Sequence, residues 1–124
     1  MRWKLVKKLI SRGSEYDEAL KNLNKVLEIY PDNSYALGVR GEVYYYKKDH
    51  DEMVKTLSKA LEIDSDNVYV LGIRGSIYLN LRKFEEALND LNKAIEIEPN
   101  NAFALSTCGG VNKSLKKYKE YRIW

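Results

Sequence analysis

Residues 36–41 read Ala-Leu-Gly-Val-Arg-Gly, and residues 70–75 read Val-Leu-Gly-Ile-Arg-Gly, 34 positions further along the chain. A weaker copy, Ala-Leu-Ser-Thr-Cys-Gly, follows at residues 104–109 after the same interval. No insertion interrupts this register. A period of 34 residues indicates a stack of similar structural units.

The triplet Leu-Asn-Lys has the same period. It occurs at residues 23–25 and 91–93, with Leu-Ser-Lys midway at 57–59. The repeat therefore extends through nearly the whole chain, which we interpret as one repeat domain, residues 1–124. Its expected units are residues 1–33, 34–67 and 68–101, followed by an incomplete fourth unit, 102–124.

Each unit contains two stretches of helical spacing. In the second unit, one apolar stripe contains Leu37, Gly41 and Tyr44, and another contains Met53 and Leu57. Because each stripe covers one face of an α-helix, two helices per unit are expected.

Proline and asparagine stand between the units. Pro31 and Pro99 stop one helix, and Asn33, Asn67 and Asn101 are suited to cap the next. Negative charge favours the N-terminal end of a helix. The acidic residues expected in the first turn of each second helix are Glu18, Glu52 and Glu86.

The recurring positions resemble the tetratricopeptide repeat family, whose 34-residue unit is a helix-turn-helix with fixed large, small and aromatic positions. The matching residues are Trp3, Leu37, Leu71 and Leu105 (large), Gly41, Gly75 and Gly109 (small), Tyr44 and Tyr78 (aromatic), and Ala19, Ala87, Leu23, Leu57, Leu91, Ala60 and Ala94 in the second helix. The resemblance implies an all-α fold: a right-handed superhelix (α-solenoid) of antiparallel helix pairs, with three tetratricopeptide repeats plus an incomplete fourth. The end units are irregular: Lys7 replaces a small residue, Asn112 an aromatic one and Tyr121 an alanine.

In that family the first helix of each unit lines a concave face where ligands lie. The resemblance therefore predicts a peptide-binding groove, and Tyr35, Tyr69 and Phe103 would form an aromatic ladder in it. The residues carried over to the groove are Tyr35, Val39, Glu42, Tyr46, Tyr69, Ile73, Asn80, Phe103 and Thr107. A second apolar stripe on a helix indicates either an interaction site or further core, and both readings stay open here.

Some members of the family grip acidic chaperone tails with a two-carboxylate clamp of lysine, asparagine and arginine. The matching positions here offer Lys4 and Lys8, followed by Val39, Tyr69 and Ile73. We therefore expect no carboxylate clamp, and a protein–protein interaction module, an adaptor or scaffold, that binds an apolar or aromatic peptide.

Two other functions compete with peptide binding. The incomplete fourth unit ends in apolar residues, Tyr121, Ile123 and Trp124. The alternative function is therefore a self-assembling structural unit, for example a homo-dimer. RNA binding is less favoured, because the middle of the chain is acidic although both ends are basic.

Composition excludes several classes. The chain has 124 residues, of which 44% are hydrophobic and 31% charged, and it contains no apolar run close to the roughly 20 residues of a membrane span. Cys108 is the only cysteine and His50 the only histidine, so we expect neither metal nor cofactor, no enzyme activity and a cytoplasmic location. Of the two arginines before the repeat glycines, Arg74 is placed to pair with Asp90, whereas Arg40 would meet Thr56.

Overall fold

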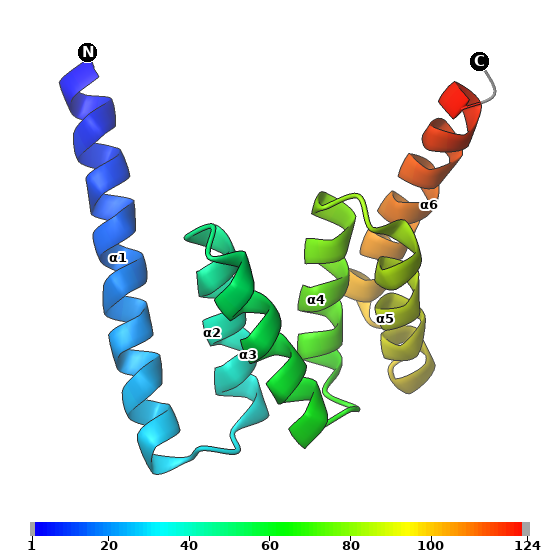
Figure 1. Cartoon of the computed structure of the whole chain (residues 1–124). Coiled ribbons are helices and arrows are strands. Elements are labelled where there is room, and N and C mark those ends of the chain that lie inside the picture. Colours follow the sequence, from blue (N-terminus) through cyan, green and yellow to red (C-terminus); the bar gives the residue numbers. More distant parts are fainter. Residues whose placement is uncertain (1, 123–124) are drawn as a thin grey trace. The chain divides into compact units, whose positions relative to one another are not determined.

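The structure is a computed structural model that describes the backbone of residues 2–122 and the side chains of residues 13–121. Within that range the chain is all-α, as predicted (Figure 1). Its helices are α1 (Arg2–Ile29), α2 (Ser34–Tyr46), α3 (His50–Ile63), α4 (Val68–Asn80), α5 (Phe84–Ile97) and α6 (Ala102–Arg122). None of these described helices is long and apolar enough to cross a membrane.

The helices fall into two compact units, residues 1–63 and residues 64–124. In the first, α2 packs against both α1 and α3; in the second, α5 packs against α4 and α6, and α4 also contacts α6. The expected right-handed superhelix concerns how one unit follows the other and stays a prediction.

Asparagine caps the first helix after each linker. The backbone N–H of Ala36 donates to Asn33 Oδ1 (3.0 Å), and the N–H of Val70 donates to Asn67 Oδ1 (3.2 Å). At Asn101 the same bond is made with the N–H of Ala104 (2.9 Å). The predicted caps are therefore confirmed, and each satisfies a backbone donor that the first turn of a helix leaves free.

The turns inside the helix pairs are also alike. Lys48 and Arg82, 34 residues apart, both have positive φ, 65° and 62°. After α2 the Lys48 N–H donates to Tyr45 O and the Asp49 N–H donates to Tyr44 O, which is the bonding pattern of a Schellman motif. The same pair of bonds follows α4, so the chain reverses direction in the same way in both units.

Glycine lets the paired helices approach closely. A methyl group at Gly41 would lie 2.6 Å from Leu57 Cγ, and one at Gly75 would lie 2.7 Å from Leu91 Cγ. Both leucines are fully buried, which stabilises each pair by about 1.5–3 kcal/mol per side chain. The predicted packing of small residues against large ones is therefore confirmed in α2/α3 and α4/α5.

The first expected repeat, residues 1–33, departs from the prediction of two helices. Figure 1 shows α1 as one uninterrupted helix, Arg2–Ile29, and Ser14, the equivalent of Lys48, lies inside it. Glu18 consequently lies in the interior of α1, not in a first turn, whereas Glu52 and Glu86 do lie in first turns. Lys7 stands where the next two repeats have Gly41 and Gly75, so folding back would bring a lysine, instead of a glycine, against Leu23.

The two repeat arginines have different partners. Arg74 makes two hydrogen bonds to Asp90, from Nε to Oδ2 (2.7 Å) and from Nη2 to Oδ1 (2.8 Å), so the ion pair is present. These hydrogen bonds raise the pKa of Arg74. Because Thr56 stands where the carboxylate would be, Arg40 reaches back to α1 instead, where Nη1 donates to Asn24 Oδ1 (3.0 Å).

The glycine contact gives a first prediction. In Gly75→Ala the new methyl group displaces Leu91, at a cost of about 1–3 kcal/mol that outweighs the gain of about 1 kcal/mol from alanine's helix propensity. Gly109→Ala, with no atom within 4 Å of the added methyl group, is the control and is expected to be neutral or stabilising. Urea unfolding measures both; equal effects of the two changes would contradict the packing described.

The ion pair gives a second prediction. Asp90→Ala leaves the partly buried guanidinium of Arg74 without its acceptor, and we expect a loss of about 3 kcal/mol of unfolding free energy. Asp17→Ala removes an exposed ion pair with Lys47 and should cost at most about 1 kcal/mol. Chemical denaturation of both variants compares them; a loss no greater for Asp90 than for Asp17 would show that burial adds nothing here.

Candidate functional site

Four of the predicted groove residues lie on α2. Tyr35, Val39, Glu42 and Tyr46 are spaced by four, three and four residues, so they share one face of this helix. Tyr35 and Tyr46 are exposed, and Val39 and Glu42 are half-buried. This face is separate from the one that Leu37 and Gly41 turn toward α3.

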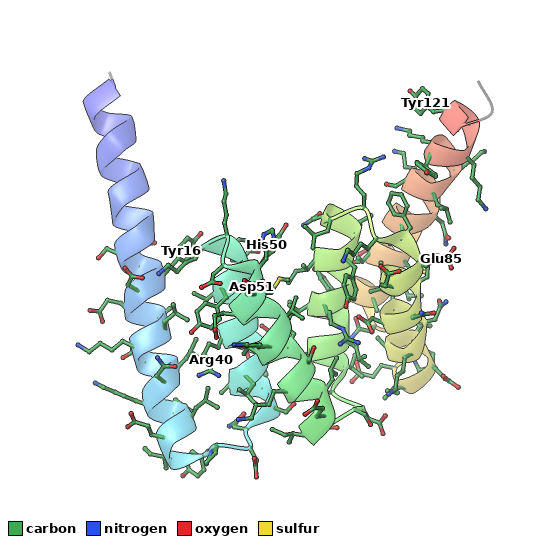
Figure 2. All side chains as sticks on the ribbon, in the orientation of Figure 1. Tyr16, Arg40, His50, Asp51, Glu85 and Tyr121 are labelled. Atoms are coloured by element: carbon green, nitrogen blue, oxygen red, sulfur yellow. The ribbon has the colours of Figure 1, made fainter. Side chains whose placement is uncertain are left out.

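Aromatic stacking fixes the C-terminal end of the α2 face. The rings of Tyr46 and Tyr16 are stacked, with centroids 6.1 Å apart and planes at 11°. Figure 2 shows Tyr16 on the side of α1 that faces α2. An ion pair between Asp17 and Lys47 lies beside the stack and raises the pKa of Lys47. Desolvation by neighbouring groups, followed by the charge of Glu42, raises the pKa of Tyr46.

In the second unit the predicted residues come from two helices, α4 and α6. Tyr69 is half-buried, Ile73 is buried and Phe103 is 49% exposed. Gly72 allows α4 and α6 to meet at this point, since a methyl group there would lie 3.1 Å from the Phe103 ring. The structure thus brings together three residues that lie far apart in sequence.

A cleft of about 380 Å³ opens between these side chains. Its lining is mainly apolar and includes Val68, Tyr69, Ile73, Glu98, Asn101 and Phe103. Asn80 and Thr107 are not part of that lining, and Tyr35 belongs to the other compact unit. Their predicted place in one continuous groove stays a prediction.

Sequence reasoning missed three of the lining residues: Val68, Glu98 and Asn101. The side chain of Asn101 donates from Nδ2 to Glu98 Oε2 (2.8 Å), which fixes a carboxylate at the mouth of an apolar cleft. The sequence could have indicated these residues, because the cap residue of a helix lies next to the first exposed residues of that helix. The prediction used only the spacing of residues along helix faces, which does not include the linker.

The expected absence of a carboxylate clamp stays a prediction. Lys4 and Lys8 are in α1, and their side chains lie outside the described residues. Val39, Tyr69 and Ile73 are apolar or aromatic, and the charged residue that lines the cleft is Glu98, an acid.

A second cleft, of about 400 Å³, lies in the first unit and is more polar. Figure 2 shows Arg40 beside α1, and its Nε is buried without a hydrogen-bond partner. The residues that line this cleft are Asn24, Leu27, Glu28, Pro31, Leu37, Arg40 and Lys59.

The remaining candidates are dispersed. His50 begins α3, is exposed and stacks on Tyr45 with ring centroids 6.1 Å apart. Tyr121 is exposed near the end of α6 (Figure 2), and Ile123 and Trp124 lie outside the described residues. Among the side chains of residues 13–121, no group of three or more His, Cys, Asp or Glu residues is placed to hold a metal ion.

Two sequence models of the tetratricopeptide repeat match the chain, at residues 34–67 and 68–101. The comparison with curated proteins gives no match.

Similar solved structures are tetratricopeptide domains. The first such domain of human RPAP3 has a TM-score of 0.76 at 24% identity, over 92% of this chain and 89% of its own. The first such domain of Spaghetti (RPAP3), bound to the HSP90 peptide SRMEEVD, has a TM-score of 0.73 at 25% identity, over 89% and 86%. The Arabidopsis OM64 domain has a TM-score of 0.70 at 21% identity, over 86% and 88%.

The environment of Tyr46 gives a third prediction. A raised pKa means that the folded state favours the neutral phenol, so this contribution to stability is present below the ordinary tyrosine pKa of about 10 and is lost as the pH rises through the raised value. The difference in tyrosinate absorbance between the wild type and Tyr46→Phe isolates this one phenol. We expect a midpoint above about 10, which Glu42→Gln lowers in part; a midpoint at or below 10 would contradict the environment described.

Proposed function

Because this chain belongs to the tetratricopeptide repeat family, whose domains are protein–protein interaction modules and typically not catalytic, we propose that it binds an apolar or aromatic peptide segment of a partner protein. The proposed binding site is the cleft between α4 and α6. The exposed face of α2, with Tyr35 and Tyr46, is proposed as a further contact surface for the partner.

The cleft is the observation that carries this proposal. Exposed aromatic side chains next to a hollow are unusual unless something covers them, because apolar surface in water costs about 25 cal/mol per Å². The ring of Phe103 stands at the rim, and Ile73 forms the floor. A volume of about 380 Å³ is near the lower end of ligand sites, which suits one or two anchoring side chains.

The partner segment that we propose differs from the peptide held by the Spaghetti (RPAP3) domain. That peptide, SRMEEVD, contains three acidic residues. Here Glu98 would repel such a segment, whereas its carboxylate can accept a hydrogen bond from an indole or a basic side chain beside an apolar anchor. An aromatic residue flanked by lysine or arginine is therefore the favoured ligand.

Peptide binding gives a fourth prediction. Fluorescence anisotropy would compare a labelled peptide of tryptophan and leucine flanked by lysines with the acidic peptide SRMEEVD. We expect the first to bind and Phe103→Ser to weaken it about tenfold or more, which corresponds to about 1.4 kcal/mol. Glu98→Gln should also lower the affinity for the basic peptide, but less strongly than Phe103→Ser.

The matched control is Leu105→Ser. Leu105 is 46% exposed, close to the 49% of Phe103, and both residues belong to α6. They are two positions apart, roughly 200° around the helix, so Leu105 does not share the cleft. Equal loss of binding in both variants, or binding of SRMEEVD alone, would refute the apolar binding site; thermal melting of each variant checks that the fold is retained.

A further inference from the structure

α6 carries a helix-pairing surface on which none of the described helices packs. Leu105, Gly109 and Asn112, here named the α6 stripe, correspond to Leu37, Gly41 and Tyr44 of α2, 68 residues earlier. Leu37 is 1% exposed, but Leu105 is 46% exposed. A methyl group at Gly41 would collide with Leu57, whereas at Gly109 it would have no atom within 4 Å. The surface that receives a partner helix is therefore present and uncovered.

α1 carries the opposite half of the same kind of pair. Ala19, Leu23 and Val26, here named the α1 stripe, correspond to Met53, Leu57 and Ala60 of α3 and to Ala87, Leu91 and Ala94 of α5. All six of those residues are at most 3% exposed. On α1, Ala19 and Leu23 are half-buried and Val26 is 37% exposed. α1 runs unbroken from Arg2 to Ile29, so among the described helices there is no first helix of this repeat to face Leu23 as α2 faces Leu57 at Gly41.

We propose that the α6 stripe of one copy of this protein docks on the α1 stripe of a second copy, so that Gly109 lies against the second copy's Leu23. The contact would repeat between chains the glycine–leucine pairing seen twice within the chain, at Gly41 with Leu57 and at Gly75 with Leu91. Each stripe lacks what the other supplies: α6 lacks a second helix, and α1 lacks a first helix. This inference stands apart from the proposed peptide binding, because it uses other faces of α1 and α6.

Helix length agrees with a contact between separate chains. α2 ends at Tyr46 because the chain turns there into α3; the equivalent position of α6 is Ser114, yet α6 continues to Arg122. α3 begins at His50, and the equivalent position of α1 is Tyr16, yet α1 begins at Arg2. Helices of different copies need no turn to join them, so both can continue past that point.

Charge also fits this register. In an antiparallel pair the sum of facing residue numbers is constant, so setting Gly109 opposite Leu23 places Lys116 near Glu15, and both are exposed in the structure.

The interface is heterologous, since it joins two different surfaces of the same chain. Contacts of this kind propagate head to tail and form an open row or a closed ring rather than stopping at a symmetric pair. This prediction separates the proposal from association through the C-terminal residues alone, which would join two copies by the same surface.

The test measures molar mass by light scattering and sedimentation, over a series of concentrations of the intact chain. Gly109→Trp blocks the α6 stripe and Leu23→Glu places a charge in the α1 stripe; Gly109 is exposed and Leu23 is only half-buried in the single chain, so both variants should fold. We expect the mass of the wild type to rise with concentration and each variant alone to stay monomeric. An equimolar mixture of the two variants keeps one intact stripe of each kind and should form a 1:1 dimer and nothing larger.

Lys117→Trp and Lys25→Glu are the matched controls, because both residues are exposed on other faces of α6 and α1 and should assemble like the wild type. A wild type that is monomeric at every concentration would overturn the proposal. So would self-association of either stripe variant alone, a mixture that stays monomeric, or controls that lose assembly with their circular dichroism unchanged. If Gly109→Trp or Leu23→Glu unfolds, Gly109→Leu and Leu23→Lys replace them in the same design.

Discussion

A glycine on one helix lies against a leucine on the next in both complete helix pairs, and the remaining architecture depends on that contact. At Gly41 and Gly75 there is no room for even one methyl group, because Leu57 and Leu91 fill the space. Close approach buries the leucines fully, and interiors packed at this density do not tolerate added volume. The 34-residue period is the sequence consequence of this constraint, since the small and the large residue must each return at the same place.

This pairing leaves a second face of each first helix available for function. In α2 and α4 the residues that pack on the neighbouring helix and the predicted groove residues lie on different sides. The cleft at Ile73 and Phe103 forms where α6 approaches α4 over Gly72. The lining described for it is apolar or aromatic apart from Asn101 and Glu98, so a single carboxylate stands beside an apolar cleft.

The same constraint explains the two irregular ends. Where the glycine position holds Lys7, α1 stays straight and its leucine stripe is uncovered; where Gly109 is kept, α6 presents a receptive surface that no described helix occupies. Both ends expose apolar surface of the kind that the glycine–leucine pairs bury in the two complete helix pairs. The association between copies and the peptide binding that we propose would use different faces of α6.

The sequence by itself determined the all-α class, the two repeats at residues 34–67 and 68–101, the asparagine caps and the glycine–leucine pairs, because each depends on local spacing that a 34-residue period makes visible. It also pointed to Arg74 and Asp90 as partners, although not to Asn24 as the partner of Arg40, which lies on the preceding helix. Only the tertiary structure showed that α1 is a single helix and that Glu98 and Asn101 complete the cleft. Whether a helix folds back, and which linker residues face a hollow, depends on contacts between segments far apart in sequence, and periodicity within one helix carries no record of those contacts.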